Sequence, residues 1–153
     1  MATGMIFSGE GFDTFAMVLE RFQHQADDIT TVWDQLADRF TDLQSRNFDS
    51  QGATMSGGWS PLSPNYAKWK ATHHPGKKIL DRGGDLRESL AGKLGIRELT
   101  RTSMTVGTQI PYAHYHQYGT RHMPARRLIG DVPVNEQLEW AKVLQKHLVE
   151  GVV

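Results

Sequence analysis

The sequence predicts an α+β fold in which a long N-terminal helix and a C-terminal helix pack on a small antiparallel β-sheet. Apolar residues recur at alternating spacings of three and four in residues 12–43, which is a helical period. The period changes to two between residues 94 and 110, and it becomes helical again over residues 136–150. A chain of 153 residues with 39% apolar composition can bury one core, so residues 1–153 are expected to form a single domain.

The N-terminal helix is expected to occupy residues 9–48. Its apolar stripe consists of Phe12, Phe15, Leu19, Phe22, Ala26, Ile29, Trp33, Leu36, Phe40 and Leu43. At about 1.5 Å per residue such a helix exceeds about 45 Å, so part of it is expected to project beyond the core. The heptad-like spacing also admits a coiled coil, but large aromatic rings fit poorly into regular knobs-into-holes packing, which favours packing on a sheet.

Residues 49–58 are small and polar, with Gly52, Gly57 and Gly58 among them, and they predict a flexible loop. This loop divides the chain by charge. Residues 1–50 hold nine acids and three bases, and the remainder holds eight acids and fourteen bases. Either the two parts fold together and neutralise one another, or they form opposite faces that favour head-to-tail stacking of subunits. Composition leaves both alternatives open.

Residues 59–131 are expected to form the central part of the domain. Ser63 and Pro64 predict the start of a helix that runs to His73, with serine at the N-cap and proline at the first helical position. Asp85 and Glu88 have the spacing of a capping box that begins a short helix burying Leu86 and Leu90.

A β-hairpin follows, in which residues 96–99 connect through a polar turn to a strand that contains Met104 and Val106. Residues 112–118 are expected to form a short helix or turn that ends at Gly119. Residues 125–129 are expected to form a further strand.

The C-terminal helix is expected within residues 132–153. Its apolar side is predicted to contain Leu138, Ala141, Leu144 and Leu148, and Gly151 is expected to end it.

The chain has no cysteine, so it has neither a disulfide framework nor a thiolate metal site. It also lacks an apolar run of about 18 residues and the basic and apolar stretches of a signal peptide at its start. We therefore expect a protein that is made in the cytoplasm and does not enter a membrane.

Several histidines lie within about fifty residues, and imidazole is a common zinc ligand. They are His73, His74, His114, His116 and His122. His114 and His116 would share a face only on a strand, whereas their neighbours favour a helical turn, so we predict no metal site.

Asp81 and Asp85 could form an acid pair, but Asp85 is explained as a cap and Asp81 lies among basic residues. The sequence also lacks a nucleophile elbow and a phosphate-binding glycine loop. We therefore predict neither catalytic residues nor a cofactor, and a metal-dependent hydrolase is the weaker alternative.

A nucleic-acid-binding module is the main alternative, because basic and aromatic residues are interspersed as in proteins that hold single strands. The basic residues are Lys68, Lys70, Lys77, Lys78, Arg82, Arg121, Arg126 and Arg127, and the aromatic residues are Trp59, Trp69, Tyr115 and Tyr118. The formal net charge of zero and the absence of a known reader module argue against it.

The order of short segments in residues 55–131 resembles the virion-morphogenesis family of tailed phages, which includes tail-completion proteins. These segments are Trp59-Ser60-Pro61-Leu62-Ser63-Pro64, Lys70, Ile79-Leu80, Gly84-Asp85-Leu86-Arg87-Glu88-Ser89-Leu90, Val106-Gly107-Thr108, Tyr112-Ala113, His116-Gln117-Tyr118-Gly119 and Met123-Pro124-Ala125-Arg126. The chain departs from the family pattern at Arg127, where a proline is common, and in residues 73–76.

The resemblance implies a structural virion protein at the neck or tail end, present as a homo-oligomeric ring on the tail axis. The implied partners are other copies of the chain and adjacent neck, tail-terminator or tail-tube proteins. Genomic DNA would pass through the ring without specific binding. The residues expected to contact neighbours are Gly57, Gly58, Trp59, Lys77, Lys78, Tyr118, Arg121, Arg126 and Arg127.

Overall fold

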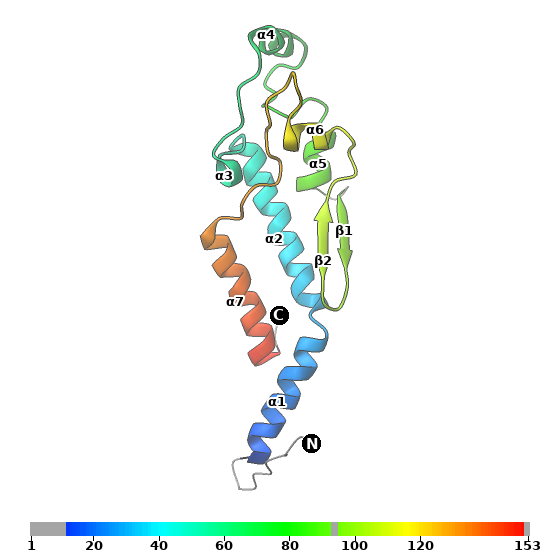
Figure 1. Cartoon of the computed structure of the whole chain (residues 1–153), viewed down its shortest axis with the longest axis vertical. Helices are drawn as coiled ribbons and strands as arrows, with labels where there is room; N and C mark the ends of the chain where they lie inside the picture. Colours follow the sequence, from blue (N-terminus) through cyan, green and yellow to red (C-terminus); the bar gives the residue numbers. More distant parts are fainter. Residues whose placement is uncertain (1–11, 93–94, 152–153) are drawn as a thin grey trace.

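The computed structural model describes residues 12–92 and 95–151, and it shows an elongated molecule (Figure 1). Helix α2 runs along the middle, with the hairpin and α5 on one side and α7 on the other, while α1 and α4 lie at opposite ends (Figure 1). The elements are α1 (Phe12–Asp27), α2 (Thr30–Asp49), α3 (Ala53–Ser56), α4 (Pro64–His73), α5 (Asp85–Ala91), β1 (Ile96–Leu99), β2 (Met104–Gly107), α6 (Ala113–Tyr118) and α7 (Val134–Glu150).

The predicted α+β class is confirmed, with N- and C-terminal helices and a small antiparallel sheet. Strands β1 and β2 pair in the register Ile96 with Gly107 and Leu99 with Met104. The turn between them is closed by Thr100, whose amide donates to the carbonyl of Ser103 at 2.9 Å. The hairpin packs against the N-terminal half of α2 and thereby covers part of its apolar face.

The N-terminal helix predicted for residues 9–48 is not continuous, and residues 9–11 of that prediction lie outside the described residues. It is interrupted between α1 and α2, where the Asp28 carboxylate accepts hydrogen bonds from the amide and hydroxyl of Thr30 at 3.0 and 2.7 Å. The Ile29 amide donates to the carbonyl of Arg101 in the hairpin turn at 3.0 Å. An amide that bonds to another part of the chain cannot continue the helical ladder, so a tertiary contact causes the break.

Residues 49–58 are not a loop throughout, because they contain the short helix α3. Gly52 precedes it with φ of 86°, and its carbonyl accepts from the amides of Ser56 and Gly58. The buried Asn47 side chain accepts a hydrogen bond from the amide of Met55 at 3.2 Å. The segment is therefore held against the core within a single chain and does not require a partner for these contacts.

We expect Gly52→Ala to lower the free energy of unfolding by about 2.5 kcal/mol. The alanine would have to adopt a positive φ, and its Cβ would overlap the Trp59 ring. A Cβ at Gly57, where φ is 71°, would meet nothing within 4 Å. Gly57→Ala should therefore cost only about 1 kcal/mol, the contribution of backbone strain. Urea unfolding of both variants measures the difference, and equal costs would contradict the role of the Gly52–Trp59 contact.

Helix α4 begins as predicted, with Ser63 at the N-cap and Pro64 at the first position, and it ends at His73, with His74 as the C-cap residue. Helix α5 buries Leu86 and Leu90 as predicted, but the proposed capping box is wrong. Its N-cap residue is Gly84, with φ of 96°, so Asp85 lies inside the first turn. A carboxylate there still interacts favourably with the helix dipole.

Residues 125–129 do not form the predicted strand. Their backbone polar groups are satisfied by side-chain amides: Gln117 Oε1 accepts from the amides of Leu128 and Ile129 at 2.8 and 3.0 Å, and Asn47 Nδ2 donates to the Leu128 carbonyl at 3.1 Å. The amide of Arg126 donates to the carbonyl of His116 in α6. With these groups satisfied, the segment has no need of a neighbouring strand.

The central core lies where α2, α5 and α6 meet the segments that follow α3 and precede α7. Its buried members are Phe48, Trp59, Leu86, Leu90, Ala113 and Leu128. Along α2 the apolar face continues toward the hairpin and α7 through Val32, Leu36, Ala37, Phe40 and Leu43. The second half of the predicted N-terminal stripe is therefore core, as expected.

Helix α7 ends at Gly151 as predicted, but it turns a different face to the core. The buried residue is His147, and Trp140 is partly buried on the same side. Of the four predicted residues, Leu144 and Leu148 are partly buried as expected. Leu138, which was expected to be in the core, is 58% exposed, and Ala141 is also exposed. The burial of an imidazole and an indole explains the error, because the prediction counted only aliphatic residues.

The two oppositely charged parts of the chain fold onto one another, which decides between the two alternatives left by composition. The ion pairs are Asp28 with Arg101, Asp34 and Asp38 with Arg97, and Asp49 with Arg87 and Lys78. Most of them are exposed, and such pairs each contribute about 1 kcal/mol or less. Their main consequence is that these carboxylates of the N-terminal half already have basic partners within the chain.

Candidate functional site

Most of the residues expected to contact neighbours lie on the surface. Gly57 and Gly58 are exposed, and a Cβ at either position would meet nothing within 4 Å. Tyr118 is 71% exposed, and Arg121 is exposed in the turn that follows it. These residues are therefore accessible to a partner.

Three exposed basic residues of the expected set have partners within the chain. Lys77 lies 3.6 Å from the Asp81 carboxylate, Lys78 donates to the carbonyl of Asp49 at 2.8 Å, and Arg127 lies 3.8 Å from Asp131. The ion pairs of Lys77 and Arg127 are long, and all three side chains are about half exposed. An incoming acidic group can compete for them at small cost.

Trp59 and Arg126, by contrast, are buried within the chain. The Trp59 ring packs edge-on against Phe48 with centroids 5.3 Å apart, and its Nε1 donates to the carbonyl of Arg127 at 2.8 Å. Arg126 is 5% exposed and donates to the carbonyls of Ser60 and Pro61 at 2.7 and 2.8 Å. Both side chains stabilise the fold, and we do not carry them into the proposed contact surface.

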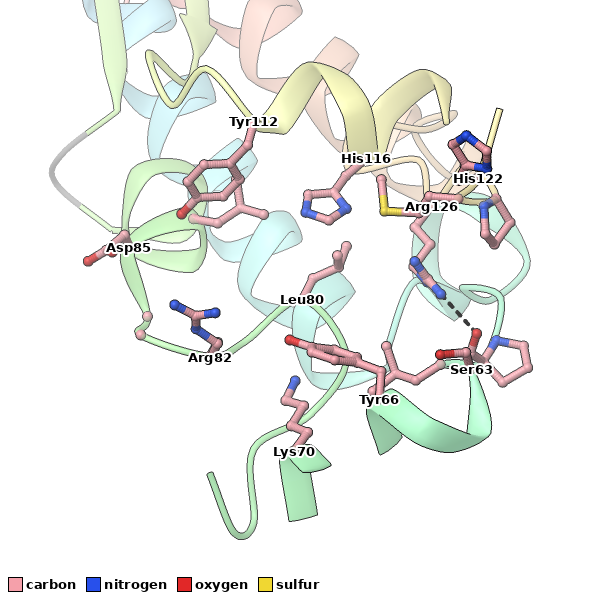
Figure 2. Close-up of a pocket in the computed structure, with 17 residues that line it drawn as sticks. Ser63, Tyr66, Lys70, Leu80, Arg82, Asp85, Tyr112, His116, His122 and Arg126 are labelled. Carbon is pink, nitrogen blue, oxygen red and sulfur yellow. Dashed lines mark hydrogen bonds between the residues drawn. The ribbon is translucent and has the colours of Figure 1, made fainter. Parts of the chain in front are cut away.

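A cleft of about 870 Å³ opens between α4, the segment before α5 and the region of α6 (Figure 2). Tyr66 and Lys70 project into it from α4, His116 from α6, and Arg82 from the segment before α5 (Figure 2). Its charged lining residues are Lys70, Arg82, Arg126 and Asp85, three cations against one carboxylate. The cleft is thus suited to an anionic group that also offers apolar surface to the tyrosines.

Two cations of the cleft are held by backbone carbonyls. Lys70 donates to the carbonyl of Lys78, and burial lowers the pKa of its ammonium group, an effect that the Asp81 carboxylate partly opposes. Burial also lowers the pKa of Arg126, which nevertheless remains charged because guanidinium is so basic. The positive charge of the cleft is therefore fixed in position by the fold.

His116 is one of the two histidines that line the cleft, and its surroundings change its ionisation. Its Nδ1 is buried and has no hydrogen-bond partner among the described residues. Burial lowers the pKa of His116, and the positive charge of Arg126 lowers it further. The imidazole is therefore kept neutral at pH 7, and protonation would place another cation beside Arg126.

Because the pKa of His116 is lower in the folded state, the unfolded state binds more protons as the pH falls through about 6.5. Stability contributed by neutral His116 is therefore present above that pH and is lost progressively below it. We expect wild type to lose more unfolding free energy than His116→Gln between about pH 7.5 and about pH 5.5. Urea unfolding at the two pH values tests this, and equal losses would contradict it.

The residues considered for chemistry are not brought together into a metal or acid–base centre. His114 and His116 lie on α6, where residues two apart diverge, as expected. Across residues 12–92 and 95–151, no group of three His, Asp or Glu side chains is placed to hold a metal ion. Asp81 faces Lys77, and Asp85 lies in the first turn of α5.

The cleft as a unit was missed by the sequence analysis, although its members were noted separately. Lys70 and Arg82 were weighed for nucleic-acid binding and His116 for metal binding. They meet because α4 and α6 approach from opposite sides (Figure 2), which no local pattern encodes. Leu80, with φ of 60°, turns the chain between them. Leucine is unusual in that conformation, so the sequence does not indicate a turn at this position.

No helix within the described ranges is both long enough and apolar enough to cross a membrane.

Comparison with known proteins gives one family and one curated relative. The phage virion morphogenesis family matches residues 12–148. The "Mu-like prophage FluMu G protein 1" of Haemophilus influenzae is 34% identical over 84 residues, which are 54% of this chain and 55% of that protein. The match thus spans about half the length of the relative. No solved structure matches the chain.

Proposed function

We propose that this chain, which belongs to the phage virion morphogenesis family, completes the tail of a phage particle or joins it to the head. The family itself establishes a role in phage virion assembly. The observation that carries the proposal is the family match over residues 12–148, nearly the whole chain, together with the tail-completion pattern of residues 55–131. In the proposed function, copies of the chain form a ring on the tail axis, without catalysis.

The proposed contact with the adjacent neck, tail-terminator or tail-tube protein uses the cationic cleft and the exposed residues near it. Tyr118 and Arg121 lie in and beside α6, whose His116 lines the cleft (Figure 2), and Lys77 follows α4. An acidic patch of the partner would meet Arg82 and Lys70, whose ammonium group the fold holds in place through the carbonyl of Lys78. Complementary charge of this kind mainly increases the rate and specificity of docking.

Electron microscopy of a lysate from phage with an early stop codon in this gene tests the function. Filled heads beside separate or abnormal tails are the expected result, because heads and tails would each assemble and fail to join. Normal infectious particles would contradict the proposal. Salt-sensitive binding of the purified chain to DNA at micromolar concentration would then favour the nucleic-acid alternative.

The contact surface is tested with Arg121→Glu and Arg127→Glu, whose side chains are exposed. We expect both variants to fold with wild-type stability, and the pair together to lower the yield of joined particles at least tenfold. Glu98→Lys, an exposed charge change on the β1 strand of the hairpin, is the control and should leave the yield of joined particles unchanged. Wild-type yield from the double variant would exclude this surface.

A further inference from the structure

Helix α1 carries an apolar stripe that no other described segment covers. Leu19, Phe22 and Ala26 have helical spacing and continue the stripe that α2 buries, yet Leu19 is 51% and Phe22 46% exposed, and Ala26 is exposed. In Figure 1, α1 extends beyond the hairpin, and it packs against the C-terminal end of α7. Large apolar side chains exposed side by side in this way are typical of a contact surface.

Helix α7 has a second stripe of this kind on its outer side. Val134, Leu138 and Val149 are 70%, 58% and 63% exposed, and Ala141 on the same face is exposed as well. The core side of the helix carries His147, nine residues after Leu138 and therefore about half a turn away around the axis. The exposed stripe thus points away from the rest of the chain.

The two stripes do not meet within one chain. Helix α1 turns a polar side to α7: Arg21 donates to the carbonyl of Glu150 at 2.8 Å, and His147 Nε2 lies 3.1 Å from the Gln25 carbonyl. Phe22 and Ala26 each follow one of these contact residues, so they point about 100° away from α7. Within residues 12–92 and 95–151, no segment of the same chain covers either stripe.

The borders of the stripes have opposite charge. Glu20 and Asp27 lie beside the stripe of α1, and Lys142 and Lys146 lie beside the stripe of α7, all of them exposed. Lys142 forms an ion pair with Glu139 at 2.6 Å, so the border made by Lys142, Lys146 and Glu139 keeps a net positive charge, which Lys146 supplies. An apolar seam with acids on one helix and bases on the other is the pattern by which paired helices choose partners.

We propose that the α1 stripe of one copy of this chain docks on the α7 stripe of the next copy. Because the two surfaces differ, the contact is heterologous, and it repeats from copy to copy until the rotation closes a ring. This inference rests on the proposed function and adds to it the surface through which the subunits of the ring meet. The core residues of each copy are not required to rearrange.

Cysteine cross-linking tests the contact, because the chain has no cysteine of its own. Phe22→Cys and Leu138→Cys lie near the middle of their stripes, so they can meet whichever way the helices run. Phage particles assembled with the double variant and oxidised with diamide are expected to give a ladder of dimers, trimers and larger species. Each single variant should remain monomeric on a non-reducing gel.

Met17→Cys with Leu138→Cys is the matched control, since Met17 is 62% exposed on α1 but lies on a different side from Phe22. It should give no ladder. The second pair across the same contact is Leu19→Cys with Ala141→Cys if the helices run antiparallel, or Ala26→Cys with Ala141→Cys if they run parallel, and it should reproduce the ladder.

Three results would overturn the inference. Particles that contain the double variant but give no ladder with either stripe pair would exclude the contact. A dimer from Phe22→Cys alone would show a two-fold α1–α1 contact instead. Particles in which the chain is absent would refute the proposed function itself, and the inference with it, so the two failures are distinguishable.

Discussion

Trp59→Ala is expected to lower the free energy of unfolding by about 4 kcal/mol, the cost of removing a large buried aromatic side chain. Trp59 is 7% exposed, packs edge-on against Phe48 and lies over Gly52. Its indole also donates to the carbonyl of Arg127, which would lose its partner. Since small domains are stable by about 5–15 kcal/mol, the variant would be close to unfolding.

Urea unfolding measures this effect, and two further variants separate its causes. Trp59→Phe keeps a ring against Phe48 but removes the donor to Arg127, so we expect it to cost less than half as much. Trp69→Ala removes a tryptophan that is 39% exposed on α4 and should cost about 1 kcal/mol or less. Equal effects of Trp59→Ala and Trp69→Ala would show that Trp59 does not hold the core.

Trp59 also shows the limit of what the sequence could predict. It begins the segment that resembles the family, and a tryptophan after two glycines is equally compatible with a core and an interface. Its burial depends on Gly52, whose positive φ returns the chain toward α2, and on the carbonyl of Arg127, 68 residues away in the sequence. Neither partner is visible to a local pattern.

Elements with local signals were predicted correctly, and those fixed by distant contacts were not. Ser63 with Pro64 marks the start of α4, and Gly119 and Gly151 mark the ends of α6 and α7. The break before α2 has no such mark, because the apolar stripe continues through Ile29 without glycine or proline and the cause is the carbonyl of Arg101.

The exposure of the residues in the proposed contact surface was predictable only in part, for the same reason. Exposed residues such as Tyr118 and Arg121 follow from the short helix and turn that the sequence indicates. The exposure of the α1 stripe does not follow from the sequence, which shows only that Leu19 and Phe22 are apolar. Whether an apolar stripe is covered depends on how far the rest of the chain extends along it, and here the hairpin ends at the break.

Arg126→Met is expected to lower the free energy of unfolding by about 3 kcal/mol, because the carbonyls of Ser60 and Pro61 would both lose a charged donor in a buried site. Methionine fills part of the volume, so the loss reports mainly the hydrogen bonds. Arg126→Lys should recover only part of it, since an ammonium group cannot reproduce the fork of a guanidinium. The neighbouring Arg127→Met, about half exposed, is the control and should cost about 0.5 kcal/mol or less.

Separate variants of Arg126 and Arg127 therefore distinguish an effect on stability from an effect on assembly. Reversing both charges at once would not distinguish them. Arg126→Glu would place a carboxylate against two carbonyls and prevent folding, so the resulting loss of joined particles would carry no information about docking. Arg127→Glu leaves these bonds intact and tests the surface alone. If Arg126→Met unfolded at the same urea concentration as Arg127→Met, the guanidinium would not support the wall of the cleft, and its assignment to the fold would have to be abandoned.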